Sequence, residues 1–147
     1  MITNLCFSLD LESIHYDDKY PELVITLDDV LLVHDYLNCN KTLKFDVMLN
    51  TGTHTLNIEL ANKGRTDTKV DNTGKIIADK AIYIKSVTIE GYALSDFLHQ
   101  ATYYPAGRDS IKSNYLGWNG VWKLNFDTPI FSWIHKTQNM GWIYNAG

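Results

Sequence analysis

The oxygen-bearing side chains that could do chemistry gather between residues 62 and 79. Asn62, Asp67 and Asp79 supply amide and carboxylate oxygens within one polar stretch. A hard cation such as calcium takes about six to eight oxygen ligands of this kind. The stretch is therefore a set from which a hard-cation site could be built. Turn chemistry is the open alternative, because Asp71 precedes Asn, Thr and Gly and can bond its own backbone amides.

Aromatic side chains gather in the last third of the chain. All four Trp residues lie at or after position 118, and the Tyr103–Tyr104 pair precedes them. Trp122 is expected in the core, because apolar residues follow it at alternate positions. We expect Trp118, Tyr103 and Tyr104 to be exposed, either as a platform for a sugar ring or as an anchor for a subunit interface.

Known catalytic motifs are missing from the sequence. The five His residues, at positions 15, 34, 54, 99 and 135, share no short motif with a nucleophile or a metal ligand. The adjacent carboxylates Asp17–Asp18 and Asp28–Asp29 face opposite sides if they lie in strands, so neither pair can share a proton. We expect that the protein is not an enzyme, and a convergent site built from distant residues is the third alternative.

Composition and charge limit the number of domains and the classes of partner that the chain can have. The chain has 147 residues and a formal net charge of −4, with its basic residues scattered, so we expect one domain and no nucleic-acid partner. No apolar run reaches the length of a membrane span, and the first residues lack the pattern of a signal peptide, so we expect a soluble protein. Cys6 and Cys39 are expected as buried free thiols, with a disulfide as the alternative.

Alternating apolar residues predict strands over much of the chain. The pattern holds in residues 7–11, 23–27, 43–49 and 56–60. Residues 50–53, Asn-Thr-Gly-Thr, read as a tight turn, so we expect the last two strands to form a β-hairpin. From these strands and the next we expect six core residues: Phe45, Val47, Leu56, Ile58, Ile84 and Ile89.

The second half continues the β pattern with two irregular points. In residues 81–90 the apolar phase shifts by one position near Lys85–Ser86, which predicts a β-bulge. Asn119–Gly120 is a turn signal that opens another strand. Residues 130–135 are expected to be extended, and residues 95–100 to form a single helical turn or short helix.

Together these patterns predict an all-β protein. Many short strands between turns are typical of a two-sheet β-sandwich or jelly roll, with at most one or two short helices. We expect a single domain over residues 1–147, with an aromatic-rich C-terminal extension from about residue 101 to 147.

The middle of the chain resembles the calcium-dependent xylan-binding carbohydrate modules, which are small β-sandwiches. Asn62 ends a strand as in those modules, Asp79 opens their Asp-Arg-Asn-Leu motif with Lys80 in place of Arg, and Glu90–Gly91 closes the following strand. The resemblance implies a sandwich fold, a bound glycan and calcium as a cofactor. If a cation binds, it implies that Asp79 contributes, with Asn62 or Asp67 nearby. Two positions depart from the pattern, each through a residue without a side-chain oxygen donor: Lys63 and Ala81.

The aromatic third is similar in style to small structural proteins of tailed bacteriophages, particularly those of marine cyanobacteria. Residues 103–105, 115–122 and 129–133 carry this second resemblance. It implies a non-catalytic structural or assembly subunit of a virion, forming homo-oligomers or contacts with other virion subunits. The alternative is a glycan-binding adhesion module, with or without calcium.

Overall fold

A computed structural model of the chain describes residues 2–93 and 100–138. The elements, in chain order, are β1 (Ile2–Ile14), β2 (Glu22–Leu27), β3 (Val30–Tyr36), β4 (Lys41–Asn50), β5 (Gly52–Leu60), a 3-10 turn η1 (Arg65–Asp67), β6 (Lys69–Val70), β7 (Ile76–Ala78), β8 (Ala81–Ile89), β9 (Tyr92–Ala93), β10 (Thr102–Pro105), β11 (Tyr115–Leu116), β12 (Gly120–Thr128) and α1 (Ile130–Gln138).

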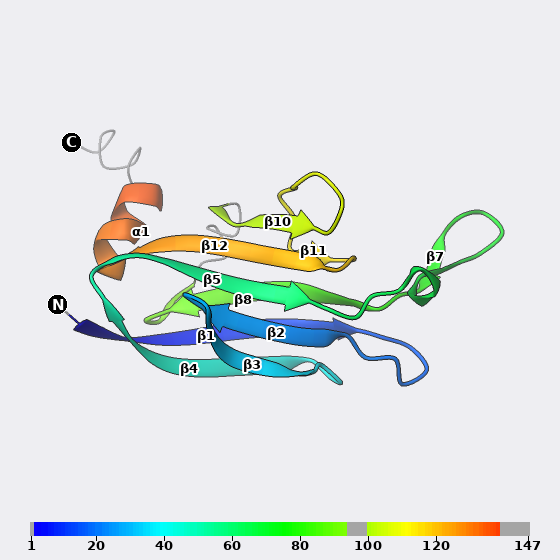
Figure 1. The fold of residues 1–147 in the computed structure, drawn as a ribbon, viewed down its shortest axis with the longest axis horizontal. Helices are drawn as coiled ribbons and strands as arrows, with labels where there is room; N and C mark the ends of the chain where they lie inside the picture. Colours follow the sequence, from blue (N-terminus) through cyan, green and yellow to red (C-terminus); the bar gives the residue numbers. More distant parts are fainter. Residues whose placement is uncertain (1, 94–99, 139–147) are drawn as a thin grey trace.

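Two antiparallel sheets pack as a sandwich, which confirms the predicted all-β class. One sheet has the strand order β11-β8-β1-β4, with β9 added to β8, and the other has the order β10-β12-β5-β2-β3. A separate two-stranded hairpin, β6–β7, reaches out from one end of the sandwich, and α1 lies at the opposite end (Figure 1). Strand β12 lies between β10 and β5, so residues 120–128 belong to the sandwich itself.

The core lies between the sheets, where the alternating apolar residues point inward. Trp122 is fully buried, as predicted, and its register partner Ile58 on β5 is fully buried too. Leu56, Ile84 and Ile89 are also buried as expected. The alternation of polar and apolar residues therefore fixes which side of each inner strand faces the core.

Two of the expected core residues are only half-buried. Phe45 and Val47 pack against the core without being enclosed by it. Both lie on β4, which is the edge strand of its sheet, so only one neighbouring strand covers them. Cys6 and Cys39 are free thiols, as expected, but they are exposed rather than buried.

The predicted bulge is confirmed at Lys85. In the pairing of β1 with β8, Asp10 faces Ser86 and the next residue, Leu11, faces Ile84. Lys85 is therefore the extra residue, and its side chain is exposed. Because of the bulge, the apolar residues before and after Lys85 all face the core, although the alternation shifts by one position there.

The predicted hairpin of residues 43–60 is wrong, although both strands exist. Strand β4 pairs with β1 in one sheet, while β5 pairs with β2 and β12 in the other. The turn around Gly52 is therefore a corner between the layers. Gly52 has a φ of 141°, which suits a tight turn. The sequence around it does not distinguish a hairpin turn from a corner between two sheets.

Residues 130–135 are helical, which corrects the prediction of an extended segment. Ile130, Trp133 and Ile134 are buried on one face of α1, at the i, i+3, i+4 spacing of a helix. Two turns of helix over nine residues give too short a pattern to outweigh the strand-like composition. The helix predicted for residues 95–100 falls, except for Gln100, outside the described residues.

Within the described ranges, no helix is long and apolar enough to cross a membrane.

Candidate functional site

The polar stretch between β5 and β8 begins with Asn62, whose side chain is committed to the fold. Its Oδ1 accepts a hydrogen bond from the Glu22 amide at 2.8 Å, and its Nδ2 donates to the Tyr20 carbonyl at 3.0 Å. These two bonds hold the start of β2 beside the end of β5. Asn62 is therefore turned towards backbone groups rather than towards the other predicted oxygen donors.

Lys63 and Asp79 form a buried ion pair. The Lys63 side chain is only 1% exposed, and its ammonium contacts Asp79 Oδ1 and donates to the Lys80 carbonyl at 2.8 Å. Asn119 fixes the Lys63 backbone, because its Oδ1 accepts from the Lys63 amide at 2.6 Å and its Nδ2 donates to the carbonyl at 2.8 Å. Lys63, which departs from the motif of the carbohydrate modules, thus contacts Asp79, the residue predicted to bind a cation.

A second buried pair joins Lys80 to Asp67. Lys80 Nζ lies 2.9 Å from Asp67 Oδ2, and the Gly64 amide donates to the same oxygen at 2.7 Å. Burial by itself raises the pKa of Asp67, but the bonds from Lys80 and Gly64 outweigh it and hold that pKa below its ordinary value. Both ion pairs connect the beginning of the stretch to its end.

Tyr115 on β11 completes the surroundings of Asp79. Its hydroxyl donates to Asp79 Oδ2 at 2.5 Å. Burial, together with this bond to a carboxylate, raises the pKa of Tyr115, so the phenol stays protonated. For Asp79, burial raises the pKa, and the bonds from Lys63, Tyr115 and Thr68 more than offset that and lower it. Asp79 is therefore an ionised carboxylate whose two oxygens both accept hydrogen bonds.

As they stand, these residues do not fit a divalent cation. Calcium requires a shell of oxygen atoms, yet the group against Asp79 Oδ1 is an ammonium, which only donates. Thr68 Oγ1 and the Lys80 amide donate to that same oxygen at 2.7 and 2.8 Å. In residues 2–93 and 100–138, no group of three His, Cys, Asp or Glu side chains could hold a metal.

A cleft opens beside this network, and we name it the Trp118 cleft. It encloses about 520 Å³ and is lined by residues that include Asp79 and the following six: Arg108, Asp109, Ile111, Ser113, Tyr115 and Trp118. The Arg108 guanidinium lies 5.3 Å from the centre of the Trp118 ring, a cation–π contact. A second cavity of about 580 Å³ also borders Arg108 and Trp118. Gly117 permits this arrangement, because a Cβ there would lie 2.9 Å from the Tyr115 ring.

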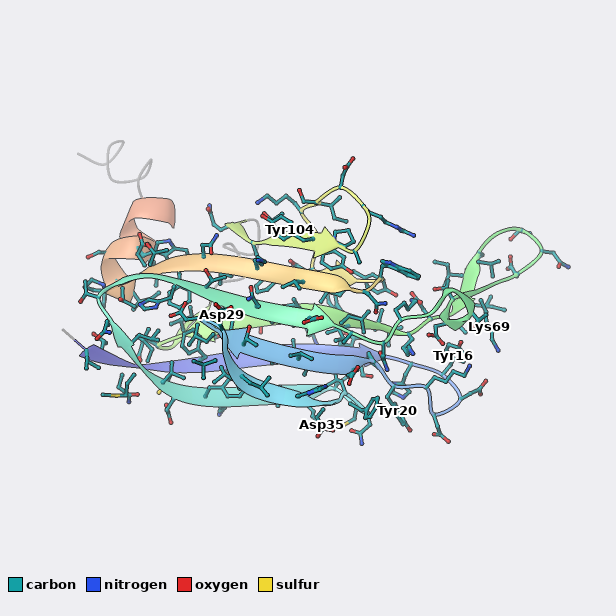
Figure 2. All side chains as sticks on the ribbon, in the orientation of Figure 1. Tyr16, Tyr20, Asp29, Asp35, Lys69 and Tyr104 are labelled. Carbon is teal, nitrogen blue, oxygen red and sulfur yellow. The ribbon has the colours of Figure 1, made fainter. Side chains whose placement is uncertain are left out.

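The three aromatic residues predicted for a platform take three different roles. Trp118 is partly exposed and lines the cleft. Tyr103 is only 2% exposed, which corrects the expectation of an exposed pair; its hydroxyl donates to the Trp118 carbonyl and accepts from the Trp118 amide at 3.2 Å. Tyr104 is exposed on β10, outside the cleft, with Lys123 Nζ 5.7 Å from its ring (Figure 2).

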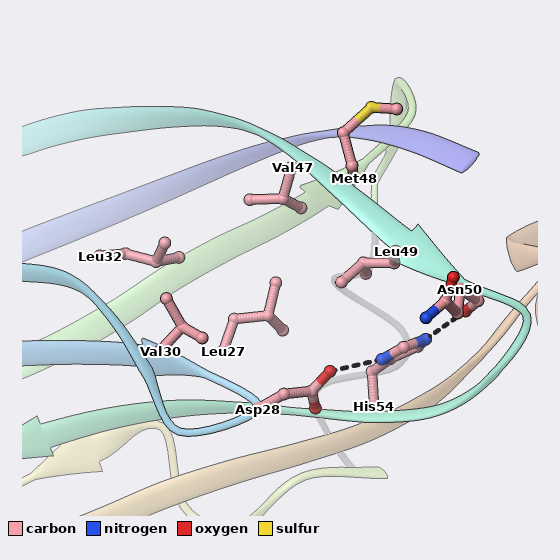
Figure 3. Close-up of a pocket in the computed structure, with 9 residues that line it drawn as sticks. All are labelled: Leu27, Asp28, Val30, Leu32, Val47, Met48, Leu49, Asn50 and His54. Carbon is pink, nitrogen blue, oxygen red and sulfur yellow. Dashed lines mark hydrogen bonds and ion pairs between the residues drawn. The ribbon is translucent and has the colours of Figure 1, made fainter. Parts of the chain in front are cut away.

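A different groove lies at the open edge of the sandwich, between β3 and β4. It encloses about 390 Å³ and is mostly apolar, with Val30, Leu32 and Val47 among the side chains that line it (Figure 3). At one end His54 Nδ1 lies 2.5 Å from Asp28 Oδ2, and its Nε2 lies 2.7 Å from the Asn50 carbonyl. This pair ties β5 to the β2–β3 turn, and the Thr128 hydroxyl of β12 lies 3.4 Å from His54 Nε2 while donating to the Asn50 carbonyl at 2.7 Å.

Sequence reasoning missed the residues that organise the site. It noted Lys63 only as a departure from a motif, and it gave no role to Tyr115 or Arg108. The signal available was the placement of lysines at both ends of a stretch rich in Asp, which favours internal ion pairs once the ends meet. That meeting depends on how β5 and β8 are arranged, which no local pattern contains.

Comparisons with known proteins agree with the fold described above. No protein family and no curated protein sequence matches this chain. Among solved structures, the carbohydrate-binding module vCBM60 in complex with galactobiose is similar at 11% identity and a TM-score of 0.53, over 82% of this chain and 98% of that one. A selenomethionine form of vCBM60, from work linking two families of calcium-dependent carbohydrate binding modules, is similar at 8% identity and a TM-score of 0.55, over 83% and 90% of the two chains. The chain therefore shares its sandwich fold with a carbohydrate-binding module.

Proposed function

We propose that this chain is a glycan-binding module and that it holds its sugar in the Trp118 cleft. The observation that carries the proposal is the meeting of partly exposed aromatic rings, Trp118 and Tyr115, with charged and hydroxyl side chains in one cavity. Sugar rings offer apolar C–H faces to aromatic rings and hydroxyl groups to polar ones. A cleft that presents both kinds of group suits such a ligand.

The size of the cleft supports the same class of ligand. About 520 Å³ lies in the usual range for small-molecule sites, which is about 300–1,000 Å³. The second cavity shares Arg108 and Trp118 with this cleft, so the two together offer room for more than one sugar ring. The structural neighbour vCBM60 binds a disaccharide, galactobiose, which supports a short oligosaccharide as the ligand here.

The proposal is tested by a glycan array followed by calorimetry on the best ligand, with galactobiose and xylo-oligosaccharides included. Replacing Trp118 with Ala should weaken binding by about thirtyfold, the equivalent of about 2 kcal/mol for a central aromatic anchor. Tyr104→Ala is the matched control, because Tyr104 is an exposed aromatic residue outside the cleft. It should leave the affinity unchanged.

Three results would count against the proposal. If no glycan on the array binds, the chain is not a glycan-binding module of this kind. If Trp118→Ala remains folded and binds as tightly as the unmodified chain, the sugar lies elsewhere. A loss caused by Tyr104→Ala instead would place the ligand on the outer face of β10.

A second candidate function is assembly into homo-oligomers or with virion subunits, and one observation favours it. The strands at the open edge of the sandwich, β3 and β4, carry exposed apolar side chains, with Met48 at 67% and Val30 at 62% exposed. Exposed apolar side chains on edge strands are typical of contact surfaces. The interface would then lie at this edge rather than at Tyr103, Tyr104 and Trp118.

Sedimentation of the purified chain tests the second candidate. An assembly subunit should show a concentration-dependent oligomer, and Met48→Lys should return it to a monomer. A chain that stays monomeric at high concentration, with or without this change, would remove the support from the open edge.

A further inference from the structure

The stretch from β5 to β8 contains a balanced set of buried charges. Lys63 and Lys80 carry two positive charges, and Asp67 and Asp79 carry two negative ones. None of the four side chains is more than 10% exposed. Buried charges persist only when they are paired and hydrogen-bonded, and each of these four has an opposite charge within ion-pair distance.

The Lys63 ammonium sits among oxygen atoms in the way that a bound cation does. It contacts Asp79 Oδ1 and the Lys80 carbonyl, and the side chains of Thr68 and Tyr115 donate to the same carboxylate. These groups come from four places in the chain: the segment after β5, the end of η1, the segment leading into β8, and β11. Asp79 gathers these groups, and the Lys63 ammonium supplies the positive charge against its carboxylate.

The Trp118 cleft depends on this junction. Asp79 and Tyr115 both line the cleft, and Asn119, next to Trp118, holds the Lys63 backbone. The wall of the cleft is thus fixed to the buried lysine on two sides. Moving the ammonium would leave the carboxylate that Tyr115 bonds buried without its charge partner.

We infer that Lys63 supplies, from within the chain, the positive charge that fastens the β5–β8 stretch, so that the fold and the Trp118 cleft need no divalent cation. The structural neighbour vCBM60 belongs to modules described as calcium-dependent. In this chain the cation is covalently attached and always present. The part of the inference that concerns the cleft rests on the proposed glycan function, whereas the part that concerns the fold does not.

The test compares thermal unfolding of the unmodified chain and three variants, each with millimolar calcium and with a chelator. The unmodified chain should melt at the same temperature in both conditions. Lys63→Met leaves Asp79 buried without its charge partner, so its melting temperature should fall by roughly 10 °C in both conditions. Lys69→Met is the matched control: Lys69 is an exposed lysine of the same stretch, near the Tyr16 ring, and losing this exposed cation–π contact should lower the melting temperature by no more than about 3 °C (Figure 2).

The third variant asks whether the position can be converted to a metal site. Lys63→Asp replaces the ammonium with a carboxylate beside Asp79 and the Lys80 carbonyl, which gives calcium the oxygen donors it prefers. This variant should be destabilised in chelator and should recover by several degrees in calcium. Lys63→Met should show no such recovery, because it adds no oxygen. If Lys63→Asp does not fold in chelator, refolding it with calcium and following tryptophan fluorescence gives the same comparison.

Three results would overturn the inference. Stabilisation of the unmodified chain by calcium would show that it uses a metal despite Lys63. An unchanged melting temperature for Lys63→Met would show that the ammonium does not fasten the stretch. Equal behaviour of Lys63→Asp in calcium and chelator would show that the position is not a cation site. Loss of glycan binding in chelator would contradict the cleft part alone, and failure to find any glycan ligand would affect only the proposed function.

Discussion

Replacing Ile58 with Ala tests the packing between the sheets. Ile58 is fully buried on β5, with Ile25 of β2 and Trp122 of β12 as its register partners on either side. The change removes three carbon atoms, about 2.4 kcal/mol at about 0.8 kcal/mol for each buried methylene. A cavity of roughly 70 Å³ left unfilled adds about 1.7 kcal/mol. The expected loss in free energy of unfolding is therefore about 4 kcal/mol.

Urea unfolding followed by tryptophan fluorescence measures this loss, and the m-value should not change, because the same surface is exposed on unfolding. Ile77→Ala is the matched control, since Ile77 is 64% exposed on β7, and it should cost less than about 0.5 kcal/mol. A loss below about 0.5 kcal/mol for Ile58→Ala would refute the register of β5 and the position of the core.

Three further predictions concern particular contacts. For His54, burial lowers the pKa, but the bonds to Asp28 and the Asn50 carbonyl raise it overall. The His54–Asp28 pair therefore stabilises the fold fully below the unfolded pKa of 6.5, and stability should fall as pH rises through the higher folded pKa. Urea midpoints at several pH values measure this fall, and Asp28→Asn should flatten the dependence of the midpoint on pH. Tyr115→Phe removes a hydrogen bond to a carboxylate and should cost about 1–2 kcal/mol by the same urea assay; no loss would mean that the bond contributes nothing. Gly120→Ala should cost about 1–3 kcal/mol, because its Cβ would lie 2.4 Å from a carbonyl oxygen of β10; an unaffected midpoint would contradict that close approach.

The strands could be predicted from the sequence wherever an inner strand has one face in the core. Leu56 and Ile58 alternate with polar residues because β5 lies between two other strands and faces the opposite sheet. The shift at Lys85 could be predicted for the same reason, since a bulge is the way a strand changes phase while keeping its apolar residues inside.

The partners of each strand could not be predicted, because pairing depends on contacts between distant segments. The turn around Gly52 has a sequence typical of β-hairpins, yet it leads from one sheet to the other. The helix at Ile130 was missed because only two turns carry its pattern. The edge position of β4, which leaves Phe45 half-buried, is likewise a property of the whole sheet.

In the candidate site, too, local sequence patterns predicted some residues, while others depend on contacts between distant segments. The importance of Asp79 could be predicted, because oxygen-rich residues surround it in the sequence. The role of Lys63 could not, because Lys63 and Asp79 are brought together only by the closure of the stretch between β5 and β8. The aromatic residues near Trp118 were identified by composition, but their alternation along β10 decides that Tyr103 is buried and Tyr104 exposed.

Nuclear magnetic resonance titration of the labelled chain with an array-selected oligosaccharide locates the glycan on the protein. In the presence of a chelator, the indole N–H of Trp118 and the amides of Arg108 and Tyr115 should shift with added ligand, while those of Val30 and Met48 at the open edge should not. Shifts confined to the open edge would contradict binding in the Trp118 cleft, and shifts that require calcium would contradict binding without a divalent cation.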